Sequence, residues 1–190
     1  EPGSLVLRED ASVSDNHGRG VRTAGTAVLQ GHARVASNFT RHSGAGIVVD
    51  GGTVTIQGHA AVARNDATRY GSGGGVLVYG GTLTLLDHAR VRRNTSVQGG
   101  GGITVYGRTS VAVLSGSSAV LRNTTEGLGG GVEVLRGDLH LEGAASITEN
   151  TAGTGGAIWV DPQDDAEVFF DLAWTGSVCG NTPDDWPTCS

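Results

Sequence analysis

Asparagine recurs along this chain at a nearly constant spacing, and the residues around it recur in the same order. The seven positions are spaced 22, 27, 29, 29, 27 and 31 residues apart, at Asn16, Asn38, Asn65, Asn94, Asn123, Asn150 and Asn181. When the chain is aligned on them, TVTIQGHAAVARN (53–65), TLTLLDHARVRRN (82–94) and DLHLEGAASITEN (138–150) follow one pattern. Repeats of this length, each one supersecondary unit, are typical of solenoids and propellers. Function is therefore sought in columns of residues that share a phase.

Each repeat contains three short runs in which apolar and polar residues alternate. In residues 46–65, GIVVDGGTVTIQGHAAVARN, the runs are separated by Gly51–Gly52 and by Gln57–Gly58. Alternation with period two indicates half-buried strands, and no segment has the 3.6-residue period of a helix. A propeller blade requires about 40 residues and four antiparallel strands, more than one repeat supplies. We predict an all-β fold: a single-stranded, right-handed parallel β-helix of about seven coils, with three short strands per coil.

Two columns define the expected core of this solenoid. The residue three before each asparagine is Val or Ile, and the residue five before it is Ala, Ser or Gly. Small residues beside β-branched ones fill a narrow interior without voids. The run SVAVL (110–114) reads one residue out of phase, so a bulge or register shift is expected there.

The asparagines themselves are expected to form a structural ladder at one turn of every coil. An Asn side chain can bond the neighbouring backbone, stacked amides can bond each other, and Asn tolerates the left-handed backbone of a sharp turn. Asn38, Asn94 and Asn123 also begin glycosylation sequons. An asparagine that points into the ladder cannot carry a glycan, so we interpret those matches as incidental.

Length and charge limit the classes of protein to which the chain can belong. One domain is expected from 190 residues with an unbroken repeat, with coils over 1–160 and a last coil with its cap over 161–190. A formal net charge of −6 argues against nucleic acid as a partner. No apolar run reaches the roughly 18 residues of a membrane span. Because the chain contains no Met, Glu1 is not a translation start, and we expect a segment of a longer precursor.

The two ends of the chain differ in character. From residue 151 onward there are acidic residues but no Arg or Lys, and aromatic residues gather over 169–186. The only cysteines, Cys179 and Cys189, enclose a polar, turn-rich segment; a disulfide is the favoured interpretation and two unlinked thiols are the alternative. We expect this end to be capped. The first coil has no such device, so we expect an upstream domain, another subunit or a partner to cover it.

After each asparagine and a variable loop, a run of Gly leads into a strand. These runs are GAGIVV (44–49), GGGVLV (73–78), GGGITV (100–105), GGGVEV (129–134) and GGAIWV (155–160). Together with the apolar-x-x-Asn element they resemble the FxxN and GGAI repeat of the chlamydial-type polymorphic outer membrane proteins, over roughly residues 5–160. Residues 155–158 match GGAI literally, and Val or Ile replaces the Phe. The resemblance implies a right-handed β-helix in a secreted, passenger-type surface domain that acts in adhesion or display.

Two groups of residues are weak candidates for a metal site. His32, His59 and His88 share the phase six residues before the asparagine, where alternation points them outward. Imidazoles about 5 Å apart could share a metal or respond to pH, and a solvated column is the alternative interpretation. Asp161, Asp164 and Asp165 form the densest acidic group, which suits calcium or polysaccharide cleavage; an acidic cap is the alternative.

An arginine-rich face is the candidate ligand-binding surface. Its members are Arg34, Arg64, Arg90, Arg93 and Arg122, with Arg92 close by. A flat face with a basic stripe suits an anionic polysaccharide or an acidic partner. The alternative is that the outer wall of a rod requires charge for solubility.

These patterns favour a binding module over an enzyme, because no acid/base set recurs in phase from coil to coil. We expect a bacterial, secreted or cell-surface β-helix, adhesin-like and non-catalytic, that binds a polysaccharide or a protein without a cofactor. A structural building block of a surface filament or layer shares all of these features. A polysaccharide lyase or hydrolase is the remaining alternative.

Overall fold

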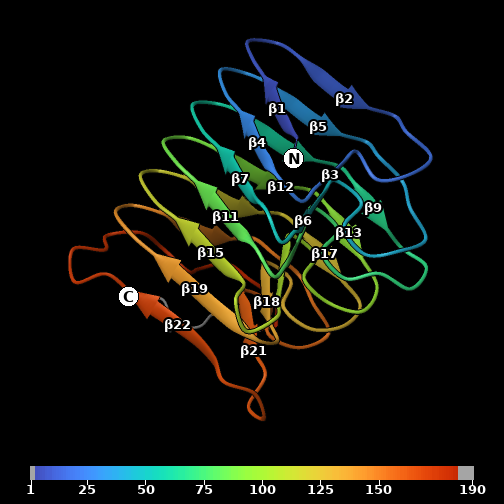
Figure 1. The fold of residues 1–190 in the computed structure, drawn as a ribbon. Coiled ribbons are helices and arrows are strands. Elements are labelled where there is room, and N and C mark those ends of the chain that lie inside the picture. The colour runs from blue at the N-terminus through green and yellow to red at the C-terminus, as the bar shows by residue number, and fades with distance from the viewer. Residues whose placement is uncertain (1–2, 184–190) are drawn as a thin grey trace.

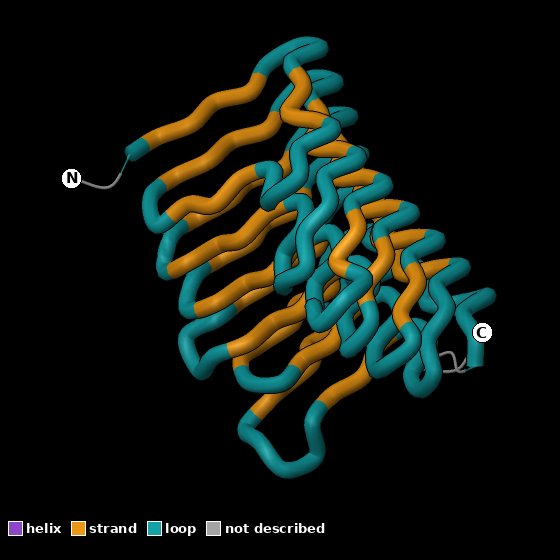
Figure 2. The backbone as a smooth tube through the Cα atoms, turned by 90° about the vertical axis from the view of Figure 1, so that its right-hand side faces the viewer, coloured by secondary structure: helices purple, strands orange, loops and turns teal. Residues whose placement is uncertain are grey.

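The structure, a computed structural model, describes residues 3–183 and shows them as a parallel β-solenoid in which no helix occurs. The chain winds through about six turns, close to the expected seven coils. Figure 1 shows equivalent strands stacked side by side from the N-terminal to the C-terminal end, and Figure 2 shows the loops gathered along the edges between the stacks.

Three long stacks of parallel strands form the walls of the solenoid, as the alternating runs predicted. The first sheet contains, in spatial order, β1 (Ser4–Leu7), β4 (Thr26–Leu29), β7 (Thr53–Ile56), β11 (Thr82–Leu85), β15 (Val111–Leu114), β19 (Gly137–Leu141) and β22 (Ala166–Phe170). The second sheet contains β2 (Ser12–Ser14), β5 (Arg34–Ala36), β8 (Ala61–Ala63), β12 (Arg90–Arg92), β16 (Ala119–Leu121) and β20 (Ser146–Thr148).

The third sheet follows the Gly runs, and a short fourth sheet lies between the second and third walls. The third contains β3 (Val21–Thr23), β6 (Ile47–Asp50), β10 (Val76–Tyr79), β14 (Ile103–Tyr106), β18 (Val132–Val134) and β21 (Ile158–Val160). The fourth contains β9 (Asp66–Ala67), β13 (Thr95–Ser96) and β17 (Thr124–Thr125). Sequence patterning did not predict the fourth sheet, because two-residue strands carry no alternation.

The core consists of aliphatic columns that point inward from all three walls. In the second sheet Val35, Val62 and Val91 are in register and fully buried, as predicted. The Ala column five residues before the asparagine is likewise buried in the interior coils, at Ala33, Ala60, Ala89 and Ala145, with Ser118 in one coil. Stacked small and β-branched side chains therefore fill the interior at every level.

The expected irregularity at residues 110–114 does not occur. Val111 pairs with Thr82 and Leu114 pairs with Leu85 in an unbroken parallel register. Ala112 and Leu114 are the buried residues of that strand. The sequence was misread because Ala stands where other coils have Leu or Val, so the weakly apolar position was assigned to the wrong face.

The asparagine ladder is present and fully bonded from coil to coil. Along the ladder, each side-chain amide donates to Oδ1 of the next asparagine at 2.7–3.0 Å. The backbone N–H of each asparagine donates to the same Oδ1, and from Asn38 onward the amide also donates to a carbonyl of the preceding coil. Asn38, Asn94 and Asn123 are fully buried, so their sequon matches are incidental, as interpreted.

The left-handed backbone at this turn does not belong to the asparagine. It belongs to the preceding residue, whose φ is close to +55° in coil after coil: Asp15, Ser37, Arg64, Arg93, Arg122 and Glu149. In the last coil Gly180 occupies the position. The asparagine therefore contributes hydrogen bonds, whereas the backbone strain of the positive φ lies at the preceding residue, whose side chain faces outward.

The Gly run is coupled to the ladder by close packing. A Cβ on Gly102 would lie 2.8 Å from Val120 Cγ1 and 2.9 Å from Asn123 Nδ2. Gly20, Gly46, Gly75 and Gly131 face the same pair of side chains in their own coils. The apolar-x-x-Asn element and the Gly run thus occur together because one residue of the run packs directly on that element in the next coil.

The C-terminal end is covered by aromatic side chains, as expected. Trp174 packs on the core, its Nε1 donates to the carbonyl of Ala145 at 3.0 Å, and its ring meets Phe170 edge-on. Cys189, the second half of the predicted Cys179–Cys189 bridge, and Trp186 lie outside the described range. The bridge therefore stays a prediction.

Candidate functional site

The predicted arginine face is built from two positions of each coil. Arg34 and Arg90 begin β5 and β12, and Ala61 separates them in the register. Arg64 and Arg93 are the left-handed residues directly before Asn65 and Asn94. All four side chains are exposed on or beside the second sheet.

Arg92 is the centre of this group. Burial is the main cause that lowers the pKa of Arg92, and the positive charges of Arg93, Arg64, Arg90 and Arg34 lower it further. Its Nε is buried and has no hydrogen-bond partner. We call Arg34, Arg64, Arg90, Arg92 and Arg93 the arginine cluster: five guanidinium groups from three successive coils, four of which lie close enough to Arg92 to lower its pKa.

Within residues 3–183 no carboxylate forms an ion pair with the arginine cluster. The ion pairs formed within residues 3–183 join Arg22 to Asp50, Arg108 to Asp165, Arg122 to Glu149 and Arg136 to Asp164. No member of the cluster takes part in any of them. Like charges concentrated without counter-charges destabilise a fold, which makes the group hard to explain as a solubility device.

Arg122 was predicted to belong to the same face, but its environment differs. Its Nε and Nη2 donate to the two carboxylate oxygens of Glu149 at 2.7 and 3.2 Å. This hydrogen-bonded pair raises the pKa of Arg122 and lowers that of Glu149. Arg122 is neutralised within the chain, so it contributes little to a surface that attracts anions.

The backbone conformation of Arg64 and Arg93 is that of the ladder turn which the coils share. Both have φ close to +55°, a conformation that disfavours a residue with a Cβ by about 1–2 kcal/mol relative to glycine. Gly180 shows that the turn accepts glycine. The same conformation recurs before other asparagines of the ladder, so it reflects the turn and does not by itself mark the two arginines as functional: Asp15, Ser37, Arg122 and Glu149.

The histidine column exists, but its geometry does not suit a shared metal. The rings of His32 and His59 stack with centroids 5.3 Å apart, and those of His59 and His88 stack at 5.1 Å, both nearly parallel. In-plane lone pairs of parallel rings do not converge on one ion. Among residues 3–183 no group of three or more His, Cys, Asp or Glu is arranged to hold a metal.

The acidic group at the C-terminal coils is divided between ion pairs and a local turn. Asp164 accepts from Arg136 Nε at 2.9 Å, and Asp165 lies 4.0 Å from Arg108. Asp161 accepts the backbone N–H of Gln163. Arginines of earlier coils therefore reach this group across the stack, which its position in the sequence did not indicate.

Sequence reasoning missed Glu133, which is buried on the outer side of β18. Its carboxylate accepts from the Thr104 hydroxyl at 3.0 Å and lies against Gly99, where a Cβ would be 2.2 Å from Oε1. Burial raises the pKa of Glu133 to about 7 despite the Thr104 bond. The available signal was GGGVEV, where none of the equivalent residues of the other coils is acidic: they are Arg, Val, Leu, Thr and Trp.

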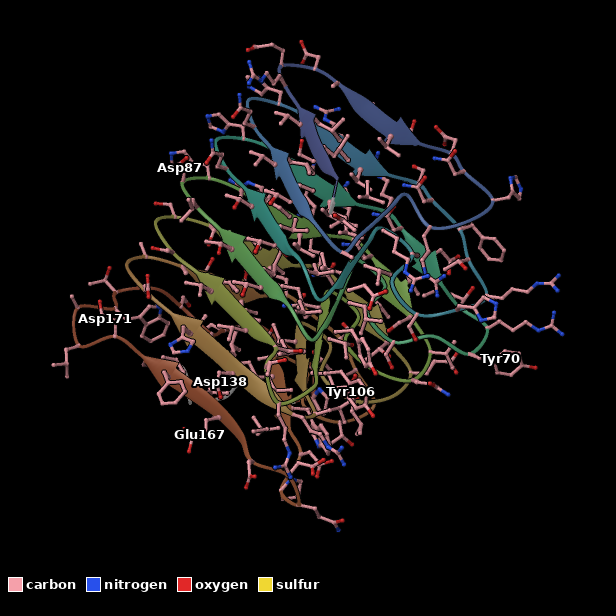
Figure 3. The ribbon with its side chains drawn as sticks, in the orientation of Figure 1. Tyr70, Asp87, Tyr106, Asp138, Glu167 and Asp171 are labelled. Carbon is pink, nitrogen blue, oxygen red and sulfur yellow. The ribbon has the colours of Figure 1, made fainter. Side chains whose placement is uncertain are left out.

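Sequence reasoning also missed two tyrosines that recur in phase. Tyr79 and Tyr106 end β10 and β14, pair in register, and stack with ring centroids 5.6 Å apart. The repeated segments GVLVYG and GITVYG carried that signal. Figure 3 shows Tyr70 at the loop side of the solenoid, with Asp87 and Asp171 at the opposite edge.

No protein-family model, curated protein or solved structure matches this chain. The stacked parallel coils implied by the resemblance to the polymorphic outer membrane protein repeat are present. Within the described residues, no helix is both long enough and apolar enough to cross a bilayer.

Proposed function

We propose that this chain is a non-catalytic β-solenoid module that binds an anionic polysaccharide through the arginine cluster, at a cell surface or outside the cell. The observation that carries the proposal is the group of four exposed guanidinium groups around Arg92, none of which forms an ion pair within residues 3–183. A polyanion would supply the counter-charge that the fold does not.

Guanidinium groups are suited to this task because their planar donors match carboxylate and sulfate oxygens in pairs. The cluster spans three coils, so its charges follow the long axis of the solenoid as repeating anions follow a polymer. A single small anion would engage only part of it.

The proposal also includes the surface location. The FxxN and GGAI resemblance supports a passenger-type domain of a secreted or outer-membrane protein, and the Cys179–Cys189 pair suits an oxidising compartment. The ion pairs of Asp164 and Asp165 support binding over polysaccharide cleavage, because both carboxylates are engaged with arginines.

The direct test is binding of dextran sulfate, with unmodified dextran as the uncharged control. We expect the wild-type chain to bind dextran sulfate with an affinity that falls as the salt concentration increases, and not to bind dextran. The variant R90Q/R93Q should weaken binding by at least about tenfold.

A matched variant separates the cluster from general charge. R122Q/R136Q removes the same two positive charges, but from arginines that already pair with Glu149 and Asp164. The loss of affinity for dextran sulfate in R122Q/R136Q should be several-fold smaller than in R90Q/R93Q. Equal losses in the two variants, or no binding by the wild type, would overturn the proposal.

A further inference from the structure

A cleft of about 460 Å³ lies over the outer face of the third sheet, away from the arginine cluster on the second. Its floor includes Leu77 and Thr104, and the stacked Tyr79 and Tyr106 form one side. Loop residues of earlier coils, among them His42, Ser72 and Tyr70, form the other side. The volume falls within the range of about 300–1,000 Å³ that is usual for small-ligand sites.

Three exposed tyrosines line this cleft, an unusual concentration in a chain with few aromatic residues. Tyr70, Tyr79 and Tyr106 are 64%, 50% and 37% exposed. None of their hydroxyls makes a hydrogen bond within residues 3–183. Exposed aromatic side chains with free polar ends are typical of surfaces that bind a ligand with one apolar face and several polar groups.

One ring face of Tyr79 is open to such a ligand. Tyr106 covers the face that points toward β14. The next residue of the column on the other side is Asp50, whose carboxylate is bound by Arg22 of the preceding coil. Among the described residues, no second aromatic ring and no cation stacks on the other face of Tyr79.

The charge of the cleft favours an acidic ligand. Arg19 lines it, and its Nε donates to the Ser43 carbonyl at 3.0 Å, which holds the group in place and leaves its terminal nitrogens for a ligand. Arg69 lies over the Tyr70 ring at 5.6 Å and adds a second cation at the rim. Among the described residues that line the cleft, none carries a carboxylate.

We infer that this cleft binds a segment of a uronate-containing glycan, with one pyranose ring on the open face of Tyr79 and its carboxylate at Arg19. A pyranose ring has an apolar C–H face and a rim of hydroxyls, which match an aromatic face bordered by tyrosine and serine hydroxyls. This site is separate from the arginine cluster and does not depend on the function proposed for it.

The test uses calorimetric titrations with trigalacturonate and its fully methyl-esterified form, in which a methyl group on each carboxylate removes the charge. We expect the wild type to bind the acid more tightly than the ester. Y79A should weaken binding of the acid by at least about tenfold, whereas Y79F, which keeps the ring, should stay within about threefold of the wild type. F169A removes an exposed aromatic that is stacked on His140 outside the cleft and should change nothing.

Two further variants test whether Arg19 recognises the carboxylate and whether the arginine cluster takes part in binding. R19Q should abolish the preference for the acid over the ester, and R90Q/R93Q should leave trimer binding unchanged. Circular dichroism and thermal unfolding check that each variant is folded. Failure of the wild type to bind either trimer, or equal affinities of Y79A and F169A, would overturn the inference without bearing on the arginine cluster.

Discussion

The side-chain amide of Asn94 donates to Asn123 Oδ1 at 3.0 Å and to the Val62 carbonyl at 3.1 Å, so one side chain joins three successive coils. Its own Oδ1 accepts the backbone N–H and the amide of Asn65. Every polar atom of this fully buried group is therefore paired, as a buried amide requires.

Replacing Asn94 by Asp should destabilise the chain by about 3–5 kcal/mol. The shape is kept, but the substitution removes both donated bonds and places a charge where two oxygen acceptors face it. Urea unfolding at pH 7 measures the loss. Asn16→Asp is the matched control, because Asn16 is exposed at the end of the ladder, and its loss should stay within about 1 kcal/mol. Equal losses would show that the ladder does not stabilise the interior.

The buried carboxylate of Glu133 should make stability fall as pH rises. Its folded pKa, about 7, lies above the value of 4.5 for an exposed glutamate. The folded state therefore holds the proton more tightly, with no penalty below pH 4.5 and a full penalty above pH 7 of roughly 3 kcal/mol. Glu133→Gln removes the charge, so the free energy of unfolding of the variant should rise relative to that of the wild type as pH increases from 4.5 to 7. Parallel pH profiles of the two proteins would contradict the assignment.

The arginine cluster should be destabilising in the absence of a bound anion. Arg92→Gln is expected to raise the melting temperature at low salt, by an amount that corresponds to no more than about 1 kcal/mol, because it removes one of five like charges. Sodium sulfate should raise the melting temperature of the wild type more than that of the variant at equal ionic strength. A lower melting temperature for the variant would mean that Arg92 is held by contacts that stabilise it.

Gly102→Ala should be among the most damaging small substitutions in the chain. The added methyl would lie 2.6 Å from the Gly131 carbonyl oxygen as well as against the ladder, and the packed neighbours cannot move apart without breaking it. We expect a loss of about 2–4 kcal/mol in denaturant unfolding. Gly18→Ala, with open space around the position, should be neutral or stabilise by up to about 1 kcal/mol.

The first coil should be the least protected part of the solenoid unless something covers it. Leu5 and Leu7 are only partly buried, whereas Leu29 in the second coil is fully buried. We expect the isolated chain to self-associate in sedimentation experiments, or the amides before Asn16 to exchange rapidly. A stable monomer with a well-protected first coil would show that the N-terminal residues suffice as a cap.

The buried columns of this fold could be predicted from the sequence, but most contacts of the outward side chains could not. Val35, Val62 and Val91 recur at one phase because each packs on the equivalent residue one coil away. The sequence pattern therefore reports this contact directly. The outward column of His32, His59 and His88 was expected from its shared phase, but the stacking of the rings was not. The position of the left-handed residue was not, because the sequence places Asp, Ser, Arg and Glu there without a common property.

The candidate sites depend on contacts that change from coil to coil. The repeat in the sequence predicts only the contacts that all coils share. Arg93 and Arg122 share a phase and a backbone conformation, yet only Arg122 is neutralised, because Glu149 replaces an arginine one coil further on. Glu133 is buried because the loop that contains Gly99 covers it, although alternation along β18 points it outward. Such loop-dependent burial is decided by tertiary packing, which the local pattern does not encode.

The ladder has a direction but no intrinsic length. Each asparagine donates to the next and accepts from the one before, so the hydrogen bonds of every interior coil are related by simple translation along the axis. Removing one whole period, or inserting one, would return every donor to an acceptor of the same kind. The number of coils is therefore set by whatever closes the two ends, and changes in length by whole repeats leave the interior chemically unchanged.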